Sequence, residues 1–260
     1  MIQGPIFDAH FHLIDPRYPL PGNNGYVPNP FTIDDYRARA SRLDIGGGAV
    51  VAGSFQGFAQ DYLVAALAEL GPSYVGVTQL PASTSDAEIL RLHDAGIRAI
   101  RFNLFRGDPG PLEDIEQLAN RVYELVGWHS EFYLDAAALP DLATLLNRLP
   151  RASIDHLAMR DDSTGTLLAL VESGVVVKAT GFGRMQVTDP DALMRSIVDA
   201  NPSGLLFGSD LPSTRAAVPF RDEDLLRVLH AVGEQHADAV IRGNAYRLYG
   251  LRSDAGAAVR

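Results

Sequence analysis

The 260-residue chain contains no cysteine, one lysine and one tryptophan. The lack of cysteine excludes disulfides, thiolate zinc sites and a cysteine nucleophile. No apolar run approaches the roughly 20 residues needed to span a bilayer, and residues 1–10 (MIQGPIFDAH) show no secretory signal pattern. The sequence therefore predicts a cytoplasmic protein.

The net charge of the protein and its few lysines indicate what kind of molecule it binds. A net charge of −10 argues against nucleic acid or an anionic membrane surface as the main partner. Among the 22 basic residues only Lys178 is lysine, and the rest are arginine. A bound planar anion must therefore be held by guanidinium groups, which match a carboxylate with two parallel hydrogen bonds.

Short apolar segments of β character alternate with segments of helical period along the chain. The expected strands cover residues 6–13, 48–54, 74–80, 97–104, 131–137, 152–158, 175–181 and 205–211. Helical patterns lie between them, and residues 222–250 are expected to form one or two closing helices. Eight such repeats predict a single (β/α)8 TIM barrel, with residues 1–260 as one domain. No glycine fingerprint of a doubly wound sheet follows the first strand.

The first expected strand carries three ionisable side chains in alternation. Period-two geometry places Asp8, His10 and His12 on one face, toward the barrel interior. A buried stack of this kind is costly unless its members have partners. A functional cluster is therefore favoured over histidines that only satisfy hydrogen bonds of the core.

Two later strands add polar residues where barrel enzymes carry their chemistry, at the carboxyl ends of strands. Residues 152–158 bring His156, with Asp155 expected on the opposite face, and residues 205–211 bring Asp210. Taken alone, His156 could make a structural hydrogen bond and Asp210 could form a turn. Together with His10 and His12 they predict a convergent site at the barrel mouth.

These motifs, in this order and spacing, resemble the amidohydrolase superfamily, specifically its amidohydrolase-2 branch. The resemblance is carried by DAHFH at 8–12, IDH at 154–156, GSDLP at 208–212 and the closing GNAYRLYGL at 243–251. Within the branch, DPRYPLP at 15–21 and IRAIRFNLFRG at 97–107 resemble the 2-pyrone-4,6-dicarboxylate lactonases. The resemblance implies a hydrolase with a TIM-barrel fold.

The metal ligands of that superfamily are incomplete here. Zinc-binding members typically add a histidine on the fifth strand, and binuclear members add a lysine or glutamate on the fourth. Here the fifth expected strand reads FYLD at 132–135, without histidine, and the fourth reads IRFNL at 100–104, without lysine or glutamate. The resembling lactonases work without metal, so no cofactor is expected. The alternative is one divalent ion, zinc, held by His10, His12, His156 and Asp210, since three such ligands suffice for catalytic zinc.

A small anionic, carboxylated molecule is the expected substrate. In the resembling lactonases, arginines after the fourth and seventh strands hold substrate carboxylates, which matches Arg101, Arg106 and Arg184. Residues 14–30, with five prolines, are expected to cover the mouth and to contribute Tyr26, while Ser54 ends the second strand.

The function expected from these residues is hydrolysis of a small carboxylated cyclic ester (a lactone) or a related C–O or C–N bond. Asp210 is expected to activate water, while His10, His12 and His156 polarise the carbonyl and the arginines orient the carboxylates. A zinc-dependent hydrolase or decarboxylase of the same superfamily is the first alternative. A barrel that binds a ligand without converting it is the second.

Overall fold

The computed structural model describes residues 4–107 and 110–251, and these form an eight-stranded parallel barrel. Its strands pair in chain order, each with the next. They are β1 (Ile6–Phe11), β2 (Ile45–Val51), β3 (Tyr74–Thr78), β4 (Ile97–Asn103), β5 (His129–Tyr133), β6 (Ala152–Ile154), β7 (Val176–Ala179) and β8 (Leu205–Phe207). The predicted (β/α)8 barrel is confirmed. Residues 1–3, 108–109 and 252–260 of the expected 1–260 domain lie outside the described residues.

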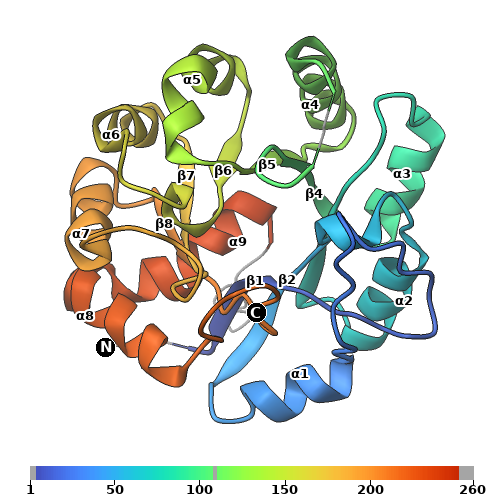
Figure 1. Cartoon of the computed structure of the whole chain (residues 1–260), viewed down its shortest axis with the longest axis horizontal. Helices are drawn as coiled ribbons and strands as arrows, with labels where there is room; N and C mark the ends of the chain where they lie inside the picture. The colour runs from blue at the N-terminus through green and yellow to red at the C-terminus, as the bar shows by residue number, and fades with distance from the viewer. Residues whose placement is uncertain (1–3, 108–109, 252–260) are drawn as a thin grey trace, which may run out of the picture.

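A helix follows every strand, and Figure 1 shows α1–α8 as a ring around the strands. The helices are α1 (Ile33–Ala40), α2 (Asp61–Leu70), α3 (Asp86–Asp94), α4 (Leu112–Val126), α5 (Leu139–Arg148), α6 (Thr164–Glu172), α7 (Pro190–Ala200), α8 (Asp222–Asp238) and α9 (Asn244–Tyr249). Within the described ranges, no helix has the length and apolar character needed to cross a bilayer. The cytoplasmic location stays a prediction.

The apolar core has two parts, and their placement leaves one end of the barrel for polar groups. The larger part lies between the strands and the surrounding helices. The smaller part fills the start of the barrel, where Phe7 and Ala9 of β1 meet Leu248 and Tyr249 of α9. Since α9 covers the amino-terminal end, the carboxyl ends of the strands form the open mouth.

The barrel closes between β1 and the segment after β8. The His12 N–H donates to the Leu211 carbonyl at 2.7 Å, and the Asp210 N–H donates to the His10 carbonyl at 2.7 Å. A Cβ atom at Gly208 would lie only 2.8 Å from the backbone nitrogen of His10. The close approach therefore requires glycine, and it brings Asp210 beside both histidines.

Candidate active site

His10, in β1, and His12, just after it, point into the barrel, whereas the Asp8 carboxylate turns toward Ser209 and Tyr36. The Asp8 carboxylate accepts hydrogen bonds from the Ser209 N–H at 2.8 Å, the Ser209 hydroxyl at 2.6 Å and the hydroxyl of Tyr36, on α1, at 3.1 Å. A register shift within β1 breaks the alternation after Asp8. The prediction that Asp8 shares a face with both histidines is therefore wrong.

His156 and Asp210 follow their strands in backbone conformations that non-glycine residues seldom adopt, with φ of 53° and 59°. Strand β6 ends just before Asp155, so Asp155 and His156 leave the alternation and both lie against His10. The expectation that Asp155 faces away is wrong. Gly181, after β7, gives His156 its space, because a Cβ there would lie 2.5 Å from His156 Nδ1.

The four predicted catalytic residues lie together and are buried. Asp210 Oδ1 is 3.8 Å from His10 Nε2 and 3.6 Å from His12 Nε2. The ring centroids of His10 and His156 are 5.0 Å apart. Residues from β1 and from the ends of β6 and β8, far apart in the sequence, therefore meet at one point.

A second cluster of buried charges faces the other side of His10. His10 Nδ1 lies 3.3 Å from Asp155 Oδ1 and 3.6 Å from Glu131 Oε1. Lys178 donates to Glu131 and to a main-chain carbonyl of β1, and Arg101 Nη2 lies 2.6 Å from Asp155 Oδ2. Two features of the sequence point to this cluster, a glutamate inside an apolar strand and the only lysine of the chain. Glu131 was not among the site residues predicted from the sequence.

The charges of the two clusters nearly balance. The cations are Arg101, Lys178 and Arg184, and the carboxylates are Glu131, Asp155 and Asp210. Burial favours the neutral form of Asp155 and Asp210, but the neighbouring charges and hydrogen bonds, led by Arg101 at Asp155 and by Arg184 at Asp210, together outweigh it and hold the pKa of each carboxyl well below its ordinary value. Burial and the nearby Asp155 charge raise the pKa of Glu131 to about 7.

Burial has the opposite consequence for the histidines. It lowers the pKa of His10 well below the ordinary value and that of His156 to about 3. At neutral pH, Asp210 is therefore ionised while both imidazoles are neutral.

A hydrogen bond of the His12 ring and an ion-pair contact of the His10 ring indicate which ring nitrogen carries the proton. His12 Nδ1 lies 2.7 Å from the Val51 carbonyl, which only accepts, so Nδ1 carries hydrogen and Nε2 keeps its lone pair. The contact of His10 Nδ1 with the Asp155 carboxylate leaves a lone pair on His10 Nε2 in the same way. Both lone pairs adjoin Asp210 Oδ1, and such a set of acceptors suits the hydrogens of a water molecule or a cation.

An overlapping set of donor atoms, with His156 in place of His12, could hold one divalent ion. His10, His156 and Asp210 each offer a ligand atom, and these atoms lie within 4.8 Å of one another. Neither ring nitrogen of His156 has a hydrogen-bond partner among the described residues. The fifth strand adds no ligand there: His129, at its start, packs against Tyr249 of α9 with ring centroids 5.0 Å apart.

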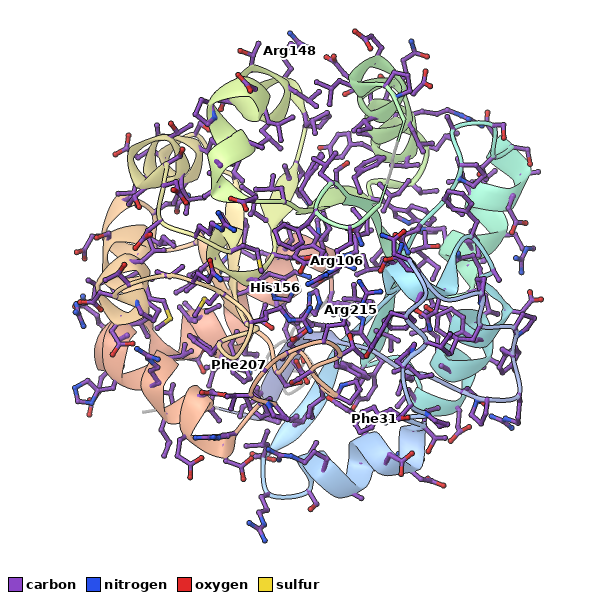
Figure 2. All side chains as sticks on the ribbon, in the orientation of Figure 1. Phe31, Arg106, Arg148, His156, Phe207 and Arg215 are labelled. Carbon is purple, nitrogen blue, oxygen red and sulfur yellow. The ribbon has the colours of Figure 1, made fainter. Side chains whose placement is uncertain are left out.

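A small polar cavity opens above this cluster. Its lining includes His12, Ser54, Asn103, Tyr133 and four arginines: Arg101, Arg106, Arg184 and Arg215. Figure 2 shows Arg106, His156 and Arg215 near the middle of the helix ring, whereas Arg148 lies at its rim. The buried Nε atoms of Arg106 and Arg184 have no hydrogen-bond partner within residues 4–107 and 110–251. Guanidinium groups with free buried donors predict a bound anion.

Residues 14–30 are joined to the arginine-bearing loops. Arg215 Nη2 donates to the Asn23 carbonyl at 2.6 Å, and the Asn23 side chain donates to the Arg106 carbonyl at 3.2 Å. The Arg215 guanidinium lies 4.2 Å from the centre of the Tyr26 ring. Tyr26 was expected to bind substrate. In the structure Tyr26 does not line the cavity itself but contacts Arg215, which lines it.

Tyr133 is a further residue of the site that the sequence reasoning missed. Its buried hydroxyl has no hydrogen-bond partner in the described part of the chain. Its ring centroid lies 5.0 Å from that of His156 and 5.2 Å from the Arg101 guanidinium. No sequence signal distinguishes Tyr133 from the aromatic core residues of β5.

Replacing Lys178 with methionine is expected to lower the free energy of unfolding by about 3 kcal/mol, because it leaves the buried Glu131 and Asp155 without one of their cations. Urea unfolding at pH 7 measures this. The loss is expected to shrink toward pH 5.5, where Glu131 takes up a proton. Arg148→Met, which breaks an exposed ion pair with Glu116, is the control. Equal stability of the two variants would contradict a structural role for the buried cluster.

The chain matches known proteins over almost its whole length. Residues 7–251 match the amidohydrolase family model. A 2-pyrone-4,6-dicarboxylate hydrolase of Comamonas testosteroni is 29% identical over 246 residues, covering 84% of this chain and 80% of that protein. A structure from Agrobacterium tumefaciens aligns with a TM-score of 0.84 at 20% identity, over 96% of this chain and 97% of the other.

A structure from Acinetobacter baumannii, described as a probable 2-pyrone-4,6-dicarboxylic acid hydrolase with citric acid bound, aligns with a TM-score of 0.82 at 21% identity. It covers 95% of this chain and all of its own. These two structural likenesses concern the fold, whereas the family model spans the strands that bring the four site residues together. The expected resemblance is thus confirmed, and the chain belongs to the amidohydrolase family.

Proposed function

We propose that this protein hydrolyses a small carboxylated lactone without a metal ion. The observation that carries the proposal is one cavity lined by two guanidinium groups whose buried Nε donors have no partner among the described residues, one of which, Arg184, contacts the buried, ionised Asp210. The name of the Comamonas relative and the citric acid bound to the Acinetobacter relative agree with an anionic substrate.

In the proposed reaction, water donates one hydrogen toward Asp210 and the other toward the lone pair of His12 or His10. Asp210 removes a proton as the water oxygen bonds to the lactone carbonyl carbon. His156 and the Tyr133 hydroxyl, which have free donors, stabilise the oxyanion. The ring C–O bond then breaks, and the proton passes from Asp210 to the leaving oxygen. The predicted role of polarising the carbonyl thus falls to His156 rather than to all three histidines.

The arginines supply binding and orientation. Arg106 and Arg184 direct their free Nε donors at substrate carboxylate, which fixes the carbonyl beside the water. Arg184 also contacts Asp210 Oδ2 at 2.8 Å and keeps this carboxylate ionised. The proposed roles of Arg101 and Ser54 are to border the cavity, since the Arg101 guanidinium already contacts Asp155 and the Ala52 carbonyl.

A second candidate is a hydrolase or decarboxylase that holds one divalent ion, and the two adjacent lone pairs of His10 and His12 favour it. His10, His12, His156 and Asp210 would hold the ion, and the ion would supply a Lewis acid. The argument for the metal-free proposal is electrostatic: Arg184 already compensates the Asp210 charge, and a divalent ion there would adjoin a buried cation.

Activity on a panel of carboxylated lactones is expected to survive exhaustive chelation. Elemental analysis of the chelated protein, run beside the rate measurement, checks that less than about a tenth of the molecules still hold metal. Loss of turnover on chelation, restored by stoichiometric zinc, would replace the metal-free proposal with the second candidate.

The turnover number is expected to stay nearly constant from about pH 5 to pH 8. The lowered pKa of Asp210 keeps the base ionised, and the lowered pKa values of His10 and His156 keep both imidazoles neutral over this range. Glu131, with a pKa of about 7, does not line the mouth cavity, so its titration leaves only a shallow step. A complete loss of turnover on acidification, centred near pH 6.5, would instead identify a histidine as the base.

A further inference from the structure

A second cavity adjoins the polar cavity at the barrel mouth. It has a volume of about 170 Å³. The two cavities share Ser54, Arg101 and Asn103 as lining residues. A molecule bound by the arginines of the mouth is thus close enough to extend a substituent into this second cavity, which we name the side cavity.

The side cavity is lined mainly by carbon. Helix α4 contributes Ile115 and Leu118, which are one turn apart on its buried face, and β4 contributes Phe102. Leu80, after β3, and Phe58 also line the cavity, and 61% of the surface of Phe58 is exposed. An apolar group that enters would remove this aromatic side chain from water.

The charges of the side cavity differ from those of the mouth. Arg101 is the one cation among the described lining residues, and its guanidinium is already bound to Asp155 and to the Ala52 carbonyl. Asp114, in the first turn of α4, also lines the cavity and repels a second anion. In contrast, Arg106 and Arg184 at the mouth have free donors. A carboxylate therefore belongs at the mouth, and an uncharged group belongs in the side cavity.

We propose that the substrate carries, beyond its carboxylated ring, an uncharged apolar substituent of up to about the size of a phenyl group, which binds in the side cavity. The size follows from the volume, because an apolar cavity of about 150 Å³ accommodates benzene. The assignment of this substituent to the substrate rests on the proposed lactone hydrolysis. The binding of an apolar group beside an anion does not, and it is testable separately.

The test uses carboxylates that cannot be hydrolysed, and titration calorimetry on the whole protein. Biphenyl-3-carboxylate and biphenyl-4-carboxylate are each compared with benzoate. Whichever of the two binds more tightly is expected to bind at least about tenfold more tightly than benzoate. Phe58→Ala, at an exposed position, is expected to remove most of this preference, and Ala82→Trp, which narrows the side cavity, to do the same. The matched control is Leu226→Ala, an apolar residue of α8 with 62% exposure that lines neither cavity.

The outcomes separate this inference from the reaction. Equal affinity for benzoate and both biphenyl carboxylates, or a preference unchanged in Phe58→Ala and Ala82→Trp, would overturn the side cavity as a binding site, even if lactones are hydrolysed. If the protein prefers biphenyl carboxylates in a manner that depends on Phe58 but hydrolyses no lactone, the side cavity is supported as a binding site and the proposed lactone hydrolysis is contradicted. Where lactones are hydrolysed, a phenyl substituent is expected to lower KM about tenfold in the native protein and little in Phe58→Ala.

Discussion

Asp210→Asn is expected to lower kcat at least about a hundredfold while KM changes by less than about threefold. Asparagine preserves the size of the side chain but cannot take a proton from water, and loss of a general base typically costs this much or more. The arginines that bind the substrate are unchanged, so binding survives. Steady-state kinetics on the best lactone of the panel, together with calorimetric binding of benzoate, measures both quantities.

Asp86→Asn provides the matched control, because Asp86 also forms an ion pair with an arginine, Arg121, but on the surface, and neither residue lines the mouth cavity or the side cavity. It is expected to keep the native kcat. Near-normal turnover in Asp210→Asn would show that another group removes the proton, and His156 would then be the next candidate to replace.

Arg106→Met is expected to lower kcat/KM by a hundredfold to a thousandfold, about 2.7 to 4 kcal/mol. Because the buried Nε of Arg106 has no partner among the described residues, we propose Arg106 as a direct ligand of the substrate carboxylate, and its loss would leave that charge unpaired in the cavity. Arg106→Lys keeps the charge but loses the two-pronged hydrogen bond, so an intermediate loss of about tenfold is expected. Arg101 and Arg184 are less diagnostic, since each also holds a buried carboxylate.

Arg121→Lys is the control for this series, since Arg121 pairs with Asp86 on the surface. Its kinetics are expected to match those of the native protein. If Arg106→Met and Arg106→Lys both retained native kcat/KM on every lactone that is hydrolysed, the substrate carboxylate would have to be bound elsewhere.

The architecture was predictable because it depends on repetition. Each strand and helix pair gives its own apolar signal, so an error at one boundary leaves the count of eight intact. That His10, His12, His156 and Asp210 would lie together was predictable for a similar reason, because two of them alternate along the first expected strand and two lie near the ends of later strands. Their meeting within one cluster follows from the barrel itself.

What could not be predicted depends on local departures from regular geometry. The register shift in β1 turns Asp8 toward Ser209, and the positive φ of His156 follows a strand that ends early, which brings Asp155 inward. Period-two reasoning assumes that neither occurs. The partners of a buried polar group are equally hidden in the sequence: nothing in it shows that Arg101 contacts Asp155 or that the Tyr133 hydroxyl has no partner among the described residues.

The most direct test of the account is the fate of a carboxylated lactone incubated with the chelated protein in ¹⁸O-labelled water, followed by mass spectrometry. Lactone hydrolysis by attack on the carbonyl carbon predicts a ring-opened product that has gained one water, with the label in the newly formed carboxylate. Loss of CO2 would indicate a decarboxylase, and an unchanged lactone that still binds would indicate a barrel that only binds its ligand. Either of these two results would contradict the proposed hydrolysis.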